Sequence, residues 1–194
     1  MLLALLVMVG WSCQSPAATT AAAGTHDSRW WLSLEDEQRT EFVAGYASYY
    51  TWKLRGPGRY SASAETIRVT IEARLKAKPA DLAVPIADVL DDEARRTTSG
   101  AGWRGNFGGH YWGELSERGR IGFLQGVLEC QRRDAKSTAK FSRADAWYAA
   151  EISKGYGMTA ADPVGSDEAL LGTGILDVLL RLEDRADQAG FGIV

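Results

Sequence analysis

The chain has few cysteines, few histidines and no excess of basic residues, and each shortage limits what it can be. Two cysteines among 194 residues allow at most one disulfide bond, which excludes a scaffold held together by several disulfides. The two histidines, His26 and His110, have no partner at the spacing of a zinc site, so we predict no metal site and no cofactor. Lysine and arginine together number 22 against 25 aspartates and glutamates, and they form no long cluster. We therefore expect no nucleic-acid partner.

The apolar run at the start of the chain, from Leu2 to Trp11, is far shorter than the roughly 20 residues of a membrane-spanning helix. It matches the apolar region of a secretory signal, which is about 7–15 residues long. Cys13 follows, and then the small-residue tract QSPAATTAAAG, which cannot build a core. We predict a signal or lipoprotein signal over residues 1–13 and a flexible tether over residues 14–29.

Two forms of export remain open. Either Cys13 is lipidated and anchors the protein to a membrane, or cleavage within the alanine-rich tract releases a soluble exported protein. The predicted location is accordingly periplasmic or membrane-anchored, with no other membrane contact.

Matching residues recur at a fixed distance along the chain, which indicates an internal repeat. The distance is 81 residues over most of the repeat and 89 near its end, because the second copy carries an insertion of eight residues. The matched pairs include Trp31 and Trp112, Arg39 and Arg120, Phe42 and Phe123, Gly45 and Gly126, Ile71 and Ile152, Ile86 and Ile175, and Asp88 and Asp177.

Each copy contains three segments with helical spacing of apolar residues, and no segment alternates like a strand. Phe42, Tyr46 and Tyr49 share one face of the first segment, and Ile67, Ile71 and Leu75 share one face of the second. We predict an all-α protein with helical units at residues 30–98 and 111–194, joined by a glycine-rich linker at residues 99–110. A unit of about 70–80 residues has a marginal core on its own. The units should therefore pack together about a pseudo-twofold axis.

Glycine interrupts the first helix of both units, at Gly45 and Gly126. A glycine inside a helix costs about 1 kcal/mol relative to alanine. The same cost at matched positions indicates a structural demand, and we predict a close approach of two helices there. Cys130 lies in the middle of the same predicted helix, and we expect a buried thiol.

One arginine and one aspartate recur in both units among otherwise apolar matches. Arg39 and Arg120 lie on the first helix, while Asp88 and Asp177 lie on the third. We predict an Arg–Asp pair that joins the two helices in each unit; the alternative is two unrelated surface charges.

Aromatic residues provide the candidate binding positions. Trp31 and Trp112 precede the first helix of each unit and either close the end of the core or form exposed platforms for sugar rings. Tyr49, Tyr50 and Trp52 add to the aromatic density of the first unit and belong to the same candidate surface.

The pattern FVAGY, followed by ETIRVTIEARLKAKPADLAVPIADVL, resembles the Rap1a/Tai family of small exported helical proteins. The resemblance covers the first unit, and the paired cysteines of that family are absent. The matching positions are Phe42, Gly45, Tyr46, Leu75, Pro79, Asp81 and residues 86–90. Because the family includes immunity proteins against secreted amidases, the resemblance implies a non-enzymatic, protein-binding role.

The sequence contains no nucleophile–base pair and no separated carboxylate pair, so we predict no catalytic residue. The expected function is that of an exported binding protein whose partner is another protein. Recognition of a cell-envelope glycan through the tryptophans and tyrosines is the alternative, and an uncharacterised hydrolase is the second alternative. We expect specific function where the two units differ, at Tyr46–Tyr60 and at Met158–Glu168.

Overall fold

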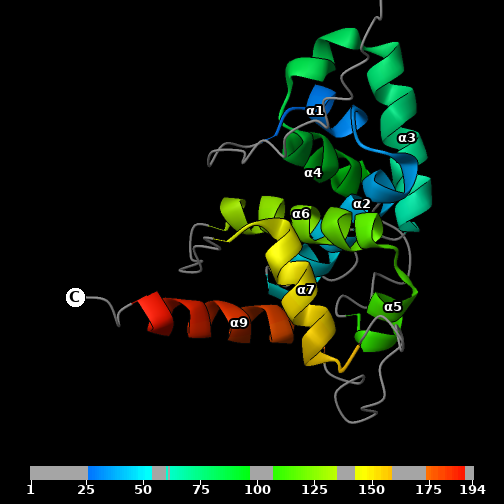
Figure 1. Ribbon diagram of the computed structural model, residues 1–194. Helices are drawn as coiled ribbons and strands as arrows, with labels where there is room; N and C mark the ends of the chain where they lie inside the picture. The colour runs from blue at the N-terminus through cyan, green and yellow to red at the C-terminus, as the bar shows by residue number, and fades with distance from the viewer. Residues whose placement is uncertain are drawn as a thin grey trace, which may run out of the picture.

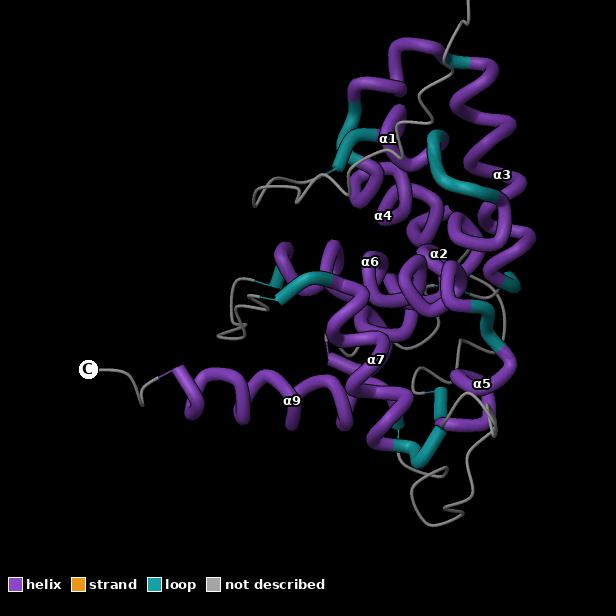
Figure 2. Tube along the Cα trace, viewed as in Figure 1, coloured by secondary structure: helices purple, strands orange, loops and turns teal. Residues whose placement is uncertain are grey.

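The computed structural model describes residues 26–53, 60, 62–96, 107–134, 143–158 and 174–190, with side chains to residue 184 in the last range. Within these ranges the chain is predominantly helical and forms no strand, which confirms the all-α prediction (Figure 2). None of the described helices has the length and apolar character needed to cross a membrane. Cys13 and the predicted signal segment lie outside the described residues, as does nearly all of Met158–Glu168.

The first half contains four α-helices and a 3-10 turn. Asp27 and Ser63 cap the first and third helices, because their side chains accept hydrogen bonds from the Trp30 and Thr66 amides. The elements are α1 (Ser28–Leu32), α2 (Asp36–Lys53), α3 (Ala64–Ala77), η1 (Pro79–Ala83) and α4 (Ile86–Arg96).

Four α-helices are described in the second half. Ser116 caps its long central helix by accepting from the Gly119 amide. Its elements are α5 (Gly109–Glu114), α6 (Glu117–Arg133), α7 (Asp145–Gly155) and α9 (Ile175–Gly190). Figure 1 shows α7 between α6 and α9, while α3 lies at the outside of the first half.

The folded part extends beyond the predicted boundaries. Ser28 is fully buried in α1, and His26 accepts a hydrogen bond from the Ile86 amide, so the predicted tether ends a few residues too late. Phe107 accepts the equivalent bond from the Ile175 amide, so the end of the predicted linker also belongs to the fold. In each half these bonds tie the entry of the first helix to the start of the last helix.

The two central helices, α2 and α6, lie side by side (Figure 1). They run in the same direction, because Glu35 contacts Arg118 near their starts and Tyr49 contacts Asp134 near their ends. A Cβ atom at Gly45 would overlap the Phe123 carbonyl group, and a Cβ atom at Gly126 would overlap the Phe42 carbonyl group. Glycine is required at both places because the two backbones touch. The predicted close approach of two helices at these glycines is confirmed.

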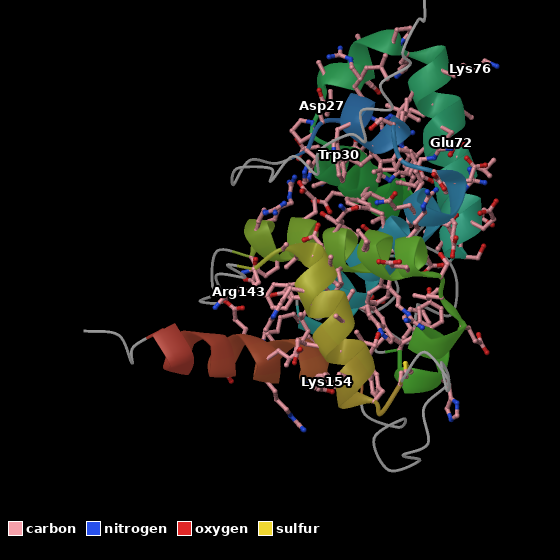
Figure 3. All side chains as sticks on the ribbon, viewed as in Figure 1. Asp27, Trp30, Glu72, Lys76, Arg143 and Lys154 are labelled. Carbon is pink, nitrogen blue, oxygen red and sulfur yellow. The ribbon has the colours of Figure 1, made fainter. Side chains whose placement is uncertain are left out.

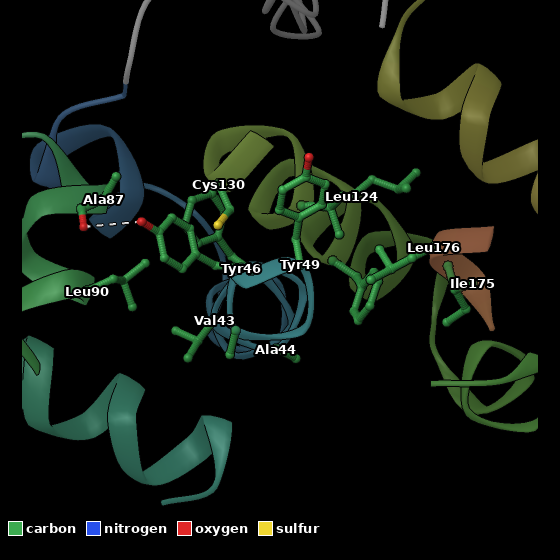
Figure 4. Packing of buried hydrophobic residues seen from close by; sticks show 14 of the residues in the cluster. Val43, Ala44, Tyr46, Tyr49, Ala87, Leu90, Leu124, Cys130, Ile175 and Leu176 are labelled. Carbon is green, nitrogen blue, oxygen red and sulfur yellow. Dashed lines mark hydrogen bonds between the residues drawn. The ribbon is translucent and has the colours of Figure 1, made fainter. Parts of the chain in front are cut away.

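Side chains from both halves form one continuous hydrophobic core. Trp31 and Trp112 are fully buried in it, as is Cys130, whose predicted burial is confirmed. Figure 4 shows the Tyr46 ring between α2, α4 and α6, with its hydroxyl near the Ala87 carbonyl and the Cys130 thiol beside it. Burial raises the pKa of that thiol well above its ordinary value, with Asp91 contributing, and this keeps it protonated.

Candidate functional site

The predicted ion pair between Arg39 and Asp88 is not formed. Arg39 instead donates to the Leu32 and Leu34 carbonyl oxygens, which terminate α1 and the turn after it. Its guanidinium lies 5.9 Å from the centre of the Trp31 ring, and its Nε is 2.9 Å from Glu72 of α3. Asp88 pairs with Arg133 of α6, at 2.6 Å.

The pair predicted between Arg120 and Asp177 is not formed either. Arg120 Nε donates to the Trp112 carbonyl oxygen at 3.0 Å, and its guanidinium lies 5.8 Å from the centre of the Trp112 ring. Its terminal nitrogens approach Gly113 O and Ser153 Oγ, both at 3.4 Å. In both halves the arginine turns back to satisfy carbonyl groups left open where a short helix ends, and therefore does not reach the last helix.

The two halves differ in what completes this arginine site. In the first half Arg39 shares Glu72 with Arg68, which also pairs with Glu65, and the pairing with Glu65 and Glu72 raises the pKa of Arg68. Eighty-one residues later the three α3 side chains Glu65, Arg68 and Glu72 are replaced by Ala146, Ala149 and Ser153. The charged side of α3, where Figure 3 labels Glu72, therefore has an uncharged counterpart on α7.

The outer side of α7 carries an exposed aromatic residue. Trp147 is 38% exposed, and Arg143 lies 5.9 Å from the centre of its ring. Ala146, Ala150 and Lys154 are exposed on the same helix. We call these residues, with Ser153, the α7 surface; Figure 3 labels Arg143 and Lys154, near its two ends. Sequence reasoning missed Trp147, although its counterpart Thr66 shows that the halves differ there.

Most of the candidate sugar-binding aromatics are buried. Trp31 and Trp112 have no exposed surface and Tyr49 is 2% exposed, so of the two alternatives the tryptophans close the core and do not form open platforms. Tyr50 and Trp52 are partly buried against Tyr60 and Tyr49 respectively. These rings lie on the inner side of α1, α2 and α5, where they pack against other side chains and are not available to a sugar.

A buried acidic group that the sequence did not indicate joins the two halves. Glu129 of α6 is completely buried, and its Oε2 lies 2.9 Å from His26 Nδ1 and 3.0 Å from Arg132. The His26 ring stacks on Trp30 with a centroid distance of 3.6 Å. Glu129 is closed off from solvent, and its carboxylate is bound by Arg132 of its own helix and by His26 of the first half. The cluster therefore links the two halves.

No group of three or more metal-ligating side chains occurs among the described residues. No family model, no curated protein and no solved structure matches the chain. The side chains of the described ranges, above all those of the α7 surface, are therefore what can indicate a function.

Proposed function

We propose that the chain is an exported, non-enzymatic protein that binds another protein through the α7 surface. The observation that supports this most directly is the exposure of Trp147, a large aromatic side chain with an arginine over its ring. Tryptophan and arginine are the residues most enriched at the energetic centres of protein interfaces.

The setting of Trp147 favours a protein partner. Small side chains, Ala146 and Ala150, flank it on the exposed side of α7, so a partner can approach the helix closely. On the corresponding side of α3, Arg68 forms ion pairs with Glu65 and Glu72. Among the described residues, the large apolar side chains that are exposed are Trp147 on α7 and Val69 on α3, and only Trp147 is aromatic.

We propose further that the protein is built from two tandem units related by a pseudo-twofold axis. The reciprocal close contacts of Gly45 with the Phe123 backbone and of Gly126 with the Phe42 backbone support this arrangement. Two isolated backbone bridges support it as well, because their residues differ by the repeat distances of 81 and 89. The bridges are Asp27–Pro85 and Gly108–Gly174.

Export is part of the same proposal, with the protein either periplasmic or held to a membrane by a lipid at Cys13. The uncharged apolar run from Leu2 to Trp11 supports it. A partner of the kind that the Rap1a/Tai resemblance implies, a secreted enzyme neutralised by binding, fits a rigid helical surface of this type.

The binding proposal is tested by affinity capture from envelope extracts, with the full chain as bait and quantified recovery of any specific partner. Trp147→Ala should reduce recovery at least about tenfold, because loss of a central interface tryptophan commonly costs 2 kcal/mol or more. Val69→Ala is the matched control, since Val69 is also exposed, on α3. Equal recovery with Trp147→Ala and wild type would contradict the proposal, as would specific retention of a polysaccharide and no protein.

A further inference from the structure

The two arginine sites differ by one carboxylate. Trp31, Arg39 and Glu72 meet in the first half, with the Arg39 Nε 2.9 Å from Glu72. Their counterparts Trp112, Arg120 and Ser153 meet in the second half, where the serine hydroxyl accepts from the Trp112 indole at 2.9 Å. The substitution at position 153 removes the carboxylate and leaves the arginine in place.

Arg120 consequently has no ion pair with any described residue. Its partners among the described residues are two backbone carbonyl oxygens and the Ser153 hydroxyl, all uncharged. Glu117 occupies the position of Asp36, but only Asp36 is in contact with its arginine. Burial lowers the pKa of Arg120, with Glu117 opposing this, whereas carboxylates raise the pKa of Arg68. A guanidinium that lacks a counter-charge in a partly desolvated position attracts an anion.

The arginine lies beside the α7 surface. Ser153, which Arg120 contacts, is one turn of α7 beyond Ala150, so it lies on the exposed alanine side of the helix. Arg120 is itself partly exposed and has five N–H donors, more than its three hydrogen bonds to described residues require. Arg143 adds positive charge near one end of the surface, while Lys154 at the other end pairs with Glu151 at 3.8 Å. Asp145, also on α7, accepts a hydrogen bond from Gln125 of α6.

We propose that Arg120 and Ser153 form a binding site for a carboxylate side chain of the partner protein, which supplies the charge that Glu72 supplies to Arg39. That a partner protein supplies the carboxylate rests on the proposed binding function. That Arg120 and Ser153 bind a carboxylate does not. An acidic residue next to an apolar one on the partner would occupy Arg120 and cover Ala150 and Trp147 together.

The Trp112 indole N–H is a direct reporter, because it donates to the same Ser153 hydroxyl that contacts Arg120. We would titrate the full chain with sodium glutarate, whose end group matches a glutamate side chain, and follow the indole signals by ¹⁵N-resolved NMR. The Trp112 signal should shift in a saturable way, and sodium chloride at the same ionic strength should not shift it. The Trp31 signal should stay constant, since Glu72 already occupies Arg39.

Two variants sharpen the test. Ser153→Glu places a carboxylate where Glu72 stands in the first half, and should weaken glutarate binding at least about tenfold while retaining the fold. Arg120→Gln removes the charge and should abolish the shift. Glu72→Ser should make the Trp31 signal respond to glutarate, provided that its circular dichroism spectrum is unchanged.

A shift that chloride reproduces, or one that persists in both Ser153→Glu and Arg120→Gln, would overturn the site. These readouts use a small carboxylate and no partner protein. A failed capture experiment with a positive titration would therefore reject the protein partner and keep the site, and the reverse result would do the opposite.

Discussion

Asp145 is a single residue whose partial burial disfavours its charged form in the folded protein. It begins α7 and accepts a hydrogen bond from Gln125 of α6 at 3.2 Å. Burial raises its pKa above the ordinary value of 3.8, although Gln125, Arg132 and His26 oppose the rise. The acidic position suits the N-terminus of a helix, but desolvation outweighs that benefit.

A raised pKa means that the folded state binds a proton more tightly than the unfolded chain does. The contribution of Asp145 to stability therefore falls as pH rises from about 3.8 through the folded pKa, and stays low above it. Asp145→Asn keeps an acceptor for Gln125 and removes the charge. Thermal melts should show the variant more stable than wild type at pH 7, with the difference shrinking toward pH 4. Asp184→Asn, at an exposed position on α9, is the control and should show little change; a destabilised Asp145→Asn protein would contradict this account.

Among the secondary-structure elements, the parallel helices α2 and α6 make the most extensive contact. Parallel neighbours place like ends of their dipoles together, which is unfavourable, and charged side chains at the ends offset it. Asp36, Glu37 and Glu117 lie in the first turns, while Arg132 and Arg133 lie in the last turn of α6. Close backbone contact at glycines then provides dense packing along the pair.

Gly126→Ala tests the contact. The new Cβ would overlap the backbone of Phe42, which cannot move aside like a flexible side chain. The two helices would have to separate, and we expect a net loss of roughly 2 kcal/mol even after the ~1 kcal/mol gained in helix propensity. That corresponds to a decrease of about 4–8 °C in the thermal midpoint.

Gly155→Ala is the matched control, because its Cβ would meet only Val178 Cγ1 at 3.5 Å, an ordinary contact. This variant should be neutral or slightly more stable. Equal effects of the two substitutions would show that the α2–α6 contact tolerates expansion.

The whole molecule is held as one unit by a shared core and by polar bonds between its halves. Arg133 of α6 pairs with Asp88 of α4, and His26 pairs with the buried Glu129. Tyr111 donates a hydrogen bond to Glu41 across the same boundary. Breaking the bond to Glu129 should be the most costly, because that carboxylate is completely buried and cannot be solvated without opening the boundary.

A core substitution in one half should therefore destabilise the other half as well. Ile71→Ala on α3 should cost about 2–5 kcal/mol, and native-state hydrogen exchange should show the slowest amides of α3 and α6 losing the same free energy of opening. Val69→Ala, exposed on the same helix, should leave both unchanged. Retained protection in α6 with lost protection in α3 would show that the halves unfold separately.

Periodicity within short windows was enough to determine the helical class and the apolar faces of the helices. The positions of Gly45 and Gly126 also indicated a close helix contact, because a glycine in a helix interior has a cost that needs a reason. Ser63 caps α3 from its place just before an apolar run, whereas α7 begins at Asp145 without a side-chain cap from Ala144. These features depend on neighbours a few residues away, which a sequence displays directly.

Tertiary structure alone decided which polar and aromatic side chains meet. The predicted pairs of Arg39 and Arg120 with aspartates of the last helices do not form, because a long side chain can reach several groups and the fold selects among them. His26 was joined to Glu129 from 103 residues away, and Trp147 was left exposed while Trp31 and Trp112 were buried. Such outcomes depend on the rotation of each helix about its axis and on the side that its neighbours cover. Both are set by packing between distant segments, which local spacing does not encode.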